Sequence, residues 1–133
     1  MKKIIKNFCI KKKNILIKTL AMPYNTNANG DIFGGWIMSQ MDMGGAILAK
    51  QIALGKVVTV QANISFFHPI SIGDIINCYG YCIKTGKSSM TIKIKIIVKR
   101  LYSKPIQEKY IAAKGIFIYV AINKNGKPKH IFK

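Results

Sequence analysis

One carboxylate stands in the middle of an apolar stretch that contains no proline. Asp42 lies between two methionines in a segment that runs from Trp36 to about Leu54. The chain has only four acidic residues, so few side chains can supply carboxylate chemistry. A carboxylate that faces an apolar interior is costly unless it has partners, and such groups are candidate general bases. Asp42 is therefore the first candidate for a catalytic residue, and a solvent-facing position on a helix is the alternative.

Two glycines stand where that segment begins. Gly34 and Gly35 precede Trp36, and the first N–H groups of a helix have no intrahelical acceptor. These groups favour negative charge, and glycine lets a substrate come close to them, so the pair could stabilise a carbonyl oxyanion. Asp42 lies two turns further along, roughly 10 Å from Gly35. That span is long for one carbonyl carbon, so the spacing favours a site in which a second subunit supplies the carboxylate.

The pattern of residues around this segment predicts the elements that position it. A helix over residues 36–54 has a short strand before it and β-branched or alternating runs after it, joined by short turns. Short turns favour antiparallel neighbours, and one helix packed on an antiparallel sheet of about five strands is an α+β fold. Gly44 and Gly45 indicate that a backbone approaches the helix closely, and Gly55 is the expected helix stop. The predicted strands cover residues 14–20, 57–67, 75–84, 88–101 and 108–122.

The charge of the chain is strongly positive. Twenty-two basic residues against four acidic ones give a formal net charge of +18, and Arg100 is the single arginine. Nucleic-acid recognition draws on arginine, whose planar fork suits phosphate and guanine, so the surplus of lysine favours codon drift in an AT-rich genome. No helix-turn-helix, zinc-finger spacing or RNP motif is visible. We expect no nucleic-acid partner, and a basic nucleic-acid-binding module is the alternative from another class.

Length and local composition predict one domain over residues 13–133 behind a basic N-terminal extension over residues 1–12. Lysines interrupt the apolar part of the extension, which argues against a secretory signal, and no stretch approaches the ~18 apolar residues of a membrane span. Cys9, Cys78 and Cys82 form no metal-ligand pattern with the two histidines. These features predict a cytoplasmic protein with free thiols, no metal and no membrane partner.

The longest motif surrounds the candidate residues. It is the run TLAMPYNTNANGDIFGGWIMSQMDMGGAILA, which resembles the signature of hotdog-fold acyl-CoA thioesterases of the YciA type. The chain continues the same pattern, in order, with the segments PISIGDIINCYGYCIKTGKSS, SKPI and VAINKNGKP. The resemblance covers about residues 14–129. It implies a hotdog fold, in which an antiparallel sheet wraps a long central helix, and homodimers with shared active sites that assemble as trimers of dimers.

The resemblance also implies an activity, the hydrolysis of acyl-CoA to a free acid and CoA, with no cofactor beyond the CoA of the substrate. The catalytic acid of the family falls on Asp42, as general base for water or, less favoured, as nucleophile. The amide that polarises the carbonyl falls on Gly35, next to Gly34. A loop asparagine used in related enzymes falls on Asn27, with Asn29 as the second choice. A hotdog protein that binds acyl-CoA without turnover is the alternative within the family.

Further residues are expected to contact the substrate. At the helix start these are Phe33 and Gly34. CoA carries a pyrophosphate and a 3′-phosphate, so lysines near its nucleotide would attract it. The turn that resembles a CoA-nucleotide contact in hotdog thioesterases consists of Gly86, Lys87, Ser88 and Ser89.

Overall fold

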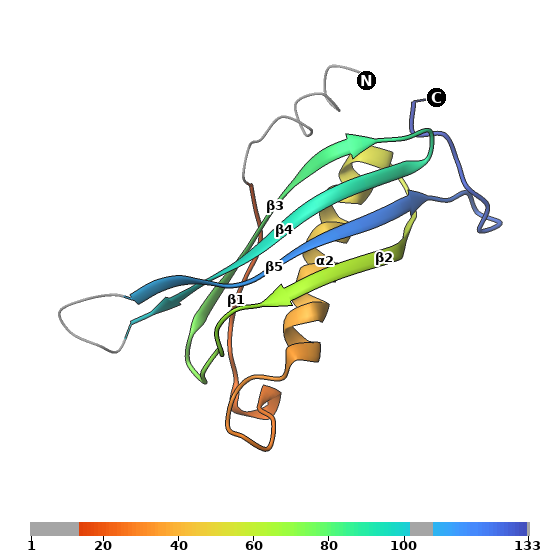
Figure 1. The fold of residues 1–133 in the computed structure, drawn as a ribbon. Helices are drawn as coiled ribbons and strands as arrows, with labels where there is room; N and C mark the ends of the chain where they lie inside the picture. The colour runs from red at the N-terminus through yellow and green to blue at the C-terminus, as the bar shows by residue number, and fades with distance from the viewer. Residues whose placement is uncertain (1–13, 102–107, 133) are drawn as a thin grey trace.

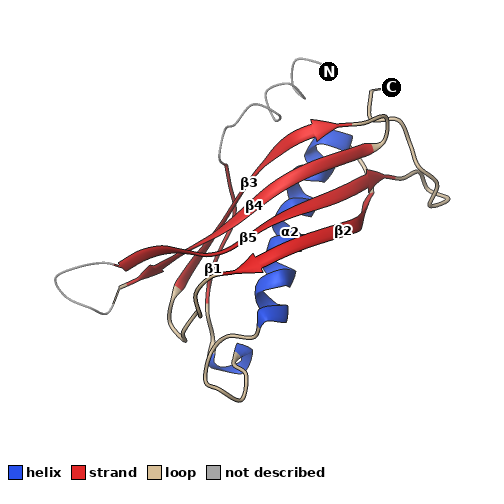
Figure 2. Cartoon of the chain, viewed as in Figure 1, coloured by secondary structure: helices blue, strands red, loops and turns tan. Residues whose placement is uncertain are grey.

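A five-stranded sheet and one long helix dominate the structure, a computed structural model that describes residues 14–101 and 108–132 (Figure 1, Figure 2). The predicted basic extension, residues 1–12, lies outside the described residues. The strands are β1 Asn14–Leu20, β2 Val57–Phe66, β3 Ile75–Thr85, β4 Ser89–Arg100 and β5 Glu108–Ala121, and the helices are α2 Gly34–Ala53 and the short 3-10 helix η1 Pro23–Asn25.

All neighbouring strands are antiparallel and follow the order β1-β3-β4-β5-β2. This architecture confirms the predicted α+β class, and the strands lie close to their predicted ranges. The helix begins at Gly34 instead of Trp36, because residues of a first turn need no intrahelical acceptor for their N–H groups. The prediction of Gly55 as the stop is wrong by one position. Leu54 takes the left-handed conformation (φ 55°), and its N–H donates to the Lys50 carbonyl at 2.8 Å.

The alternation of apolar and basic residues along β4 determines which face of the sheet packs against the helix. The apolar side chains of β4 face α2, whereas its lysines face the other side of the sheet. Ile92, Ile94 and Ile96 are fully buried, and α2 buries Leu48 and Ile52 in the same core. Burial of one such side chain contributes about 1.5–3 kcal/mol. This apolar layer therefore sets which side of α2 faces inward, and with it the direction of every polar side chain on the helix.

The two glycines inside α2 are needed because side chains cross the helix closely. A Cβ on Gly44 would lie 2.8 Å from Cys78 Sγ, and a Cβ on Gly45 would collide with the Tyr119 hydroxyl and lie 2.7 Å from Ile94 Cδ1. The expectation of a close approach at this point is confirmed. The expectation that a backbone makes it is wrong, because the nearest atoms belong to side chains of β3, β4 and β5.

Gly45→Ala will destabilise the fold, although alanine is the better helix former. The added Cβ meets Tyr119 and Ile94, so we expect the free energy of unfolding to fall by about 1–3 kcal/mol, the usual cost of overpacking. Gly35→Ala is the matched control, because no atom lies within 4 Å of its added Cβ. We expect that variant to be neutral or more stable by up to about 1 kcal/mol. Urea denaturation of both variants measures the difference, and equal stabilities would contradict this account of the interior glycines.

Candidate active site

Asp42 lies half-buried in the middle of α2, and two hydroxyl groups donate hydrogen bonds to one of its carboxylate oxygens. Thr59 Oγ1 of β2 lies 2.6 Å from Asp42 Oδ1, and the Tyr119 hydroxyl of β5 lies 3.1 Å from the same oxygen. Within the described part of the chain, Oδ2 has no hydrogen-bond partner. The carboxylate is therefore held through one oxygen while the other is available to accept a proton.

Tyr119 reaches this position from the core. Its side chain is fully buried, and its hydroxyl also lies 2.9 Å from the main-chain carbonyl oxygen of Asp42. Burial, and then the negative charge of Asp42, raises the pKa of Tyr119 above its ordinary value, so the hydroxyl stays protonated and donates. Neither Tyr119 nor Thr59 is predicted from the sequence, because tyrosine and threonine are ordinary strand residues. The one local signal is Gly45, which leaves the space that the hydroxyl occupies.

A β-bulge aims Thr59 at the helix. The register of β2 against β5 shifts between Thr59 and Gln61, so Val60 is an extra residue in β2. A bulge bends its strand and redirects the neighbouring side chains, often next to an active site. Here the neighbouring side chain is that of Thr59, and its hydroxyl reaches Asp42.

The start of α2 is uncapped. Phe33 is the N-cap residue, and no side chain accepts a hydrogen bond from the first turn there. Gly34 and Gly35 therefore present backbone N–H groups that have no intrahelical acceptor. The space next to Gly35 is open, since an added Cβ would meet no atom within 4 Å. This geometry suits the approach of a carbonyl oxygen that gains negative charge.

A cavity of about 320 Å³ opens beside this helix start. Asn27 lines it, whereas Asn29 does not. Asn27 Oδ1 accepts hydrogen bonds from the backbone N–H groups of Asn29 (2.8 Å) and Asp31 (3.2 Å). The carboxamide oxygen is thus used within the loop, and Nδ2 is the donor left for the cavity. The lining residues are Asn27, Asp31, Ile32, Gly34, Ile37, Phe66, Phe67, His68 and Pro69.

An ion pair holds the loop that closes one wall of this cavity. Arg100 donates to both carboxylate oxygens of Asp74, at 3.0 and 2.9 Å, and the Asp74 side chain is fully buried. Arg100 also donates to the Tyr110 hydroxyl at 2.9 Å. That hydroxyl in turn donates to the carbonyl oxygen of Pro69 at 2.8 Å. The single arginine of the chain therefore positions Pro69, a lining residue, from β4.

One subunit does not bring all of the candidate residues together. Asn27 and Gly34 line the same cavity, but Asp42 lies two turns along α2 and does not line it. Phe33 stands at the helix start with 52% of its surface exposed. The rise of a helix puts Asp42 roughly 10 Å from Gly35.

The candidate CoA-binding turn lies further away still. Residues 86–88 join β3 to β4, whose first residue is Ser89, at the end of the molecule where α2 terminates, opposite the helix start (Figure 1). The carbonyl oxygen of Lys87 accepts a hydrogen bond from the Ile131 N–H at 2.9 Å. The same C-terminal segment begins at Ile122, whose N–H donates to the Lys56 carbonyl just after the helix, at 3.0 Å. Within one subunit, the turn and Gly34 therefore lie at opposite ends of α2.

Cysteine, metal and membrane features add little to the site. Cys78 and Cys82 are buried and form no disulfide, and burial raises the pKa of Cys78 to about 12, so that thiol packs as a small apolar group. Cys9 lies outside the described residues. Across residues 14–101 and 108–132, no cluster of three His, Cys, Asp or Glu residues could hold a metal ion, and no helix is long and apolar enough to cross a membrane.

Comparison with known proteins places these features in a family. The sequence model of the thioesterase superfamily matches residues 29–101. A relative from Buchnera aphidicola subsp. Schizaphis graminum, described as an uncharacterized acyl-CoA thioester hydrolase, is 64% identical over 118 residues, which are 88% of this chain and 87% of the relative. The acyl-CoA thioester hydrolase YciA of Salmonella typhimurium is 53% identical over 116 residues, 86% of this chain and 87% of YciA.

A solved structure extends the likeness to three dimensions. It is an aspartate-to-alanine mutant of HI0827, described as a hexameric broad specificity acyl-coenzyme A thioesterase. The two chains are 55% identical and superpose with a TM-score of 0.86 over 90% of this chain and 87% of the other. The match to the superfamily model, residues 29–101, includes Asn29, the helix start and Asp42 and begins two residues after Asn27. The chain therefore belongs to the thioesterase superfamily and has the hotdog fold.

Proposed function

We propose that this protein hydrolyses acyl-CoA thioesters to a free carboxylic acid and CoA. The observation that carries the proposal is the carboxylate of Asp42, which Thr59 and Tyr119 hold through one oxygen. The same helix begins with Gly34 and Gly35, and no side chain caps its first turn. The family relatives support it, because those named above are described as acyl-CoA thioester hydrolases or thioesterases.

In the proposed reaction, Asp42 Oδ2 accepts a proton from a water molecule as the water oxygen attacks the thioester carbonyl carbon. The carbonyl oxygen gains negative charge, which the N–H groups of Gly35 and Gly34 stabilise. Asn27 Nδ2 orients the water or the carbonyl group. The carbon–sulfur bond then breaks, and the proton held by Asp42 passes to the sulfur of CoA. We propose no cofactor, because a thioester is activated enough for carboxylate-assisted attack.

We infer that the site forms between two subunits. A separation of roughly 10 Å along one helix is too long for Asp42 and Gly35 of the same chain to act on one carbonyl carbon. Two copies related by a two-fold axis would bring the Asp42 of one helix opposite the helix start of the other. Each dimer would then hold two equivalent sites, and each site would use residues of both chains.

The edge strand β2 is the surface that we propose for this contact. It is ten residues long and uncharged, and it lies at one end of the strand order, whereas exposed edges are usually blunted by charge or proline. The helix α2, which β2 contacts through Thr59 and Asp42, exposes Met38, Met43 and Ile47, each 41–48% exposed. A second copy that adds its own β2 in antiparallel orientation would pair the edge and cover these side chains. Three such dimers would make a hexamer, the assembly described for HI0827.

Two-fold symmetry also gives the 86–89 turn a role. An antiparallel partner would bring its turn towards the helix start of the first subunit, although the turn and the helix start lie at opposite ends of a single subunit. We propose that the exposed Lys87 attracts the phosphates of CoA there. Gly86, Ser88 and Ser89 would contact the nucleotide, and Phe33 and Gly34 would contact the thioester end.

Asp42→Asn will remove the general base while it keeps the shape of the side chain. We expect kcat for thiol release from acyl-CoA to fall by about 10²–10⁴-fold, the usual contribution of a general base. Asp31→Asn is the matched control, because Asp31 lines the cavity but is not assigned a catalytic role. Purified proteins are compared over acyl chains from short to long, with circular dichroism as the check on folding. An unchanged kcat in the Asp42 variant would contradict the assignment of Asp42 as the general base. A wild-type protein that binds CoA without any turnover would be a binding protein instead of an enzyme.

Thr59→Val and Tyr119→Phe will each remove one hydrogen bond to the Asp42 carboxylate, and Tyr119→Phe also removes the contact of the hydroxyl with the Asp42 carbonyl oxygen. We expect kcat to fall by about tenfold in each, because one bond to a charged group is worth about 1.5 kcal/mol or more, and KM to change little. Ser65→Ala is the control, since Ser65 lies on β2 but makes no bond to Asp42. Steady-state kinetics separate the two parameters. A loss confined to KM would show that the hydroxyls serve binding instead of the carboxylate.

Val60→Lys will place a charge on the proposed dimer edge. Val60 is the bulged residue and has no partner on β5, so the change leaves the subunit's own sheet intact. We expect the oligomer to dissociate and thioester hydrolysis to be lost with it. Ile15→Lys on the other edge strand is the control, because Ile15 and Val60 are both 56% exposed. Sedimentation velocity gives the masses, and a Val60 variant that dissociates to active monomers would contradict the shared site.

A further inference from the structure

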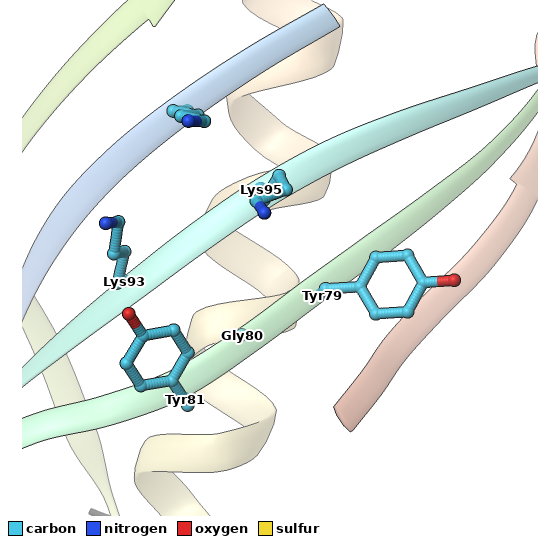
Figure 3. Close-up of a pocket in the computed structure, with 6 residues that line it drawn as sticks. Tyr79, Gly80, Tyr81, Lys93 and Lys95 are labelled. Carbon is cyan, nitrogen blue, oxygen red and sulfur yellow. The ribbon is translucent and has the colours of Figure 1, made fainter. Parts of the chain in front are cut away.

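The outer face of the sheet carries a cavity that the proposed reaction does not use (Figure 3). Its volume is about 200 Å³, and it lies on the side of the sheet away from α2. Its walls come from three neighbouring strands. They are formed by Tyr79, Gly80 and Tyr81 of β3, Lys93 and Lys95 of β4, and Lys114 of β5.

Strand register places the lining side chains in two adjacent rows. Tyr79, Lys95 and Lys114 are direct partners across the three strands. Tyr81 and Lys93 are partners in the next row on this face, two residues along each strand. Because neighbouring strands lie about 4.8 Å apart, the three lysine side chains surround one small volume. All three are partly buried, as are both tyrosines.

Two lysines of this cavity form a like-charged pair across neighbouring strands. Lys95 lies directly opposite Lys114, and like charges in that position destabilise a sheet. None of the six lining residues is acidic. An anion bound between the ammonium groups would offset their repulsion. The pair Lys99 and Lys109 repeats this opposition on the same two strands, so the cavity and its tyrosine rings, and not the opposed charges alone, distinguish this site.

The tyrosine rings add a second kind of surface to the cavity. In Figure 3 both rings lie flat along the sheet, and the Tyr81 hydroxyl points towards the strand that carries Lys93 and Lys95. An aromatic ring that shows its face to solvent can stack against another planar group. The cavity therefore combines cations with a stacking surface.

We propose that this outer cavity binds a nucleotide that carries at least two phosphate groups. Lys93, Lys95 and Lys114 hold the phosphates, and the base stacks on a tyrosine ring. Phosphate alone would account for the lysines, whereas the rings favour a ligand with a planar group. A second copy of the chain is a poor occupant, because the net charge of +18 and the absence of acidic residues from the lining make two such faces repel each other.

Isothermal titration of the intact protein with ADP, at fixed ionic strength, tests the proposal. The test variant combines Lys93→Gln with Lys114→Gln, and the control combines Lys99→Gln with Lys109→Gln. The control residues are also a directly opposed pair on β4 and β5, outside the cavity, and their removal changes the net charge by the same amount. We expect ADP binding to weaken by tenfold or more in the test variant, about the effect of one charge-assisted bond, and to change little in the control.

Two further probes separate the parts of the ligand. Pyrophosphate is expected to bind more weakly than ADP but with the same dependence on Lys93 and Lys114. Tyr81→Leu is expected to weaken ADP and to leave pyrophosphate unchanged. These substitutions lie outside the proposed active site and leave any ADP binding there unchanged, so the difference between the variants measures the outer cavity. Hydrolysis of acyl-CoA is expected to be unchanged in both lysine variants, which keeps this proposal separate from the catalytic one.

Several results would overturn the proposal. Equal loss of ADP binding in the test and control variants would show attraction by the overall charge alone. Pyrophosphate that binds as tightly as ADP would remove the role of the rings, and with it the nucleotide. Binding of ADP that no outer-face variant changes would leave the cavity without a ligand of this class.

Discussion

The packing of Tyr119 against Gly45 of α2 is the contact on which the candidate site depends. Gly45 has no side chain, so the buried hydroxyl can reach both the carbonyl and the carboxylate of Asp42, at 2.9 and 3.1 Å. One contact thus fixes two quantities, the rotation of the helix against β5 and the direction of the carboxylate. A larger residue at position 45 would displace the ring, and the carboxylate would lose one of its two donors. The sheet, and not the helix alone, places the candidate base.

The helix is covered by its own sheet on one side only. The isoleucines of β4 bury its inner face, whereas Met38, Met43 and Ile47 of the helix remain exposed. Thr59 belongs to that edge strand and holds Asp42 from there. The edge strand and the carboxylate therefore lie next to one another, on a helix that also exposes apolar side chains. This is why the packing of one subunit already favours a site made by two.

Strand alternation separates charge from the core in this molecule. Isoleucine and lysine alternate along β4, so the lysines gather on the outer face while the isoleucines pack on α2. The ion pair of Arg100 with the buried Asp74 has a different role, because it holds the Pro69 loop at the cavity beside the helix start. The net charge of the chain says little about function by itself. The position of each lysine in the strand register distinguishes the outer cavity from the rest of the basic surface.

Much of the fold follows from the sequence, because alternation, turn residues and a long apolar helix are local properties. The sequence by itself determines the α+β class, the five strands and the helix, and it names Asp42, Gly35 and Asn27 as candidates. It locates the crowded point at Gly45 but not the side chain that causes the crowding.

Only the tertiary structure decides which residues surround those candidates. Thr59 and Tyr119 meet Asp42 because a bulge and a strand register bring them there, and neither depends on nearby sequence. The structure also separates the 86–89 turn from Gly34 by the length of α2, although both belong to one continuous sequence pattern. The physical reason is the same in both cases. Residues that are neighbours in the sequence fix the local conformation, whereas the pairing order and register of the strands fix which distant side chains meet.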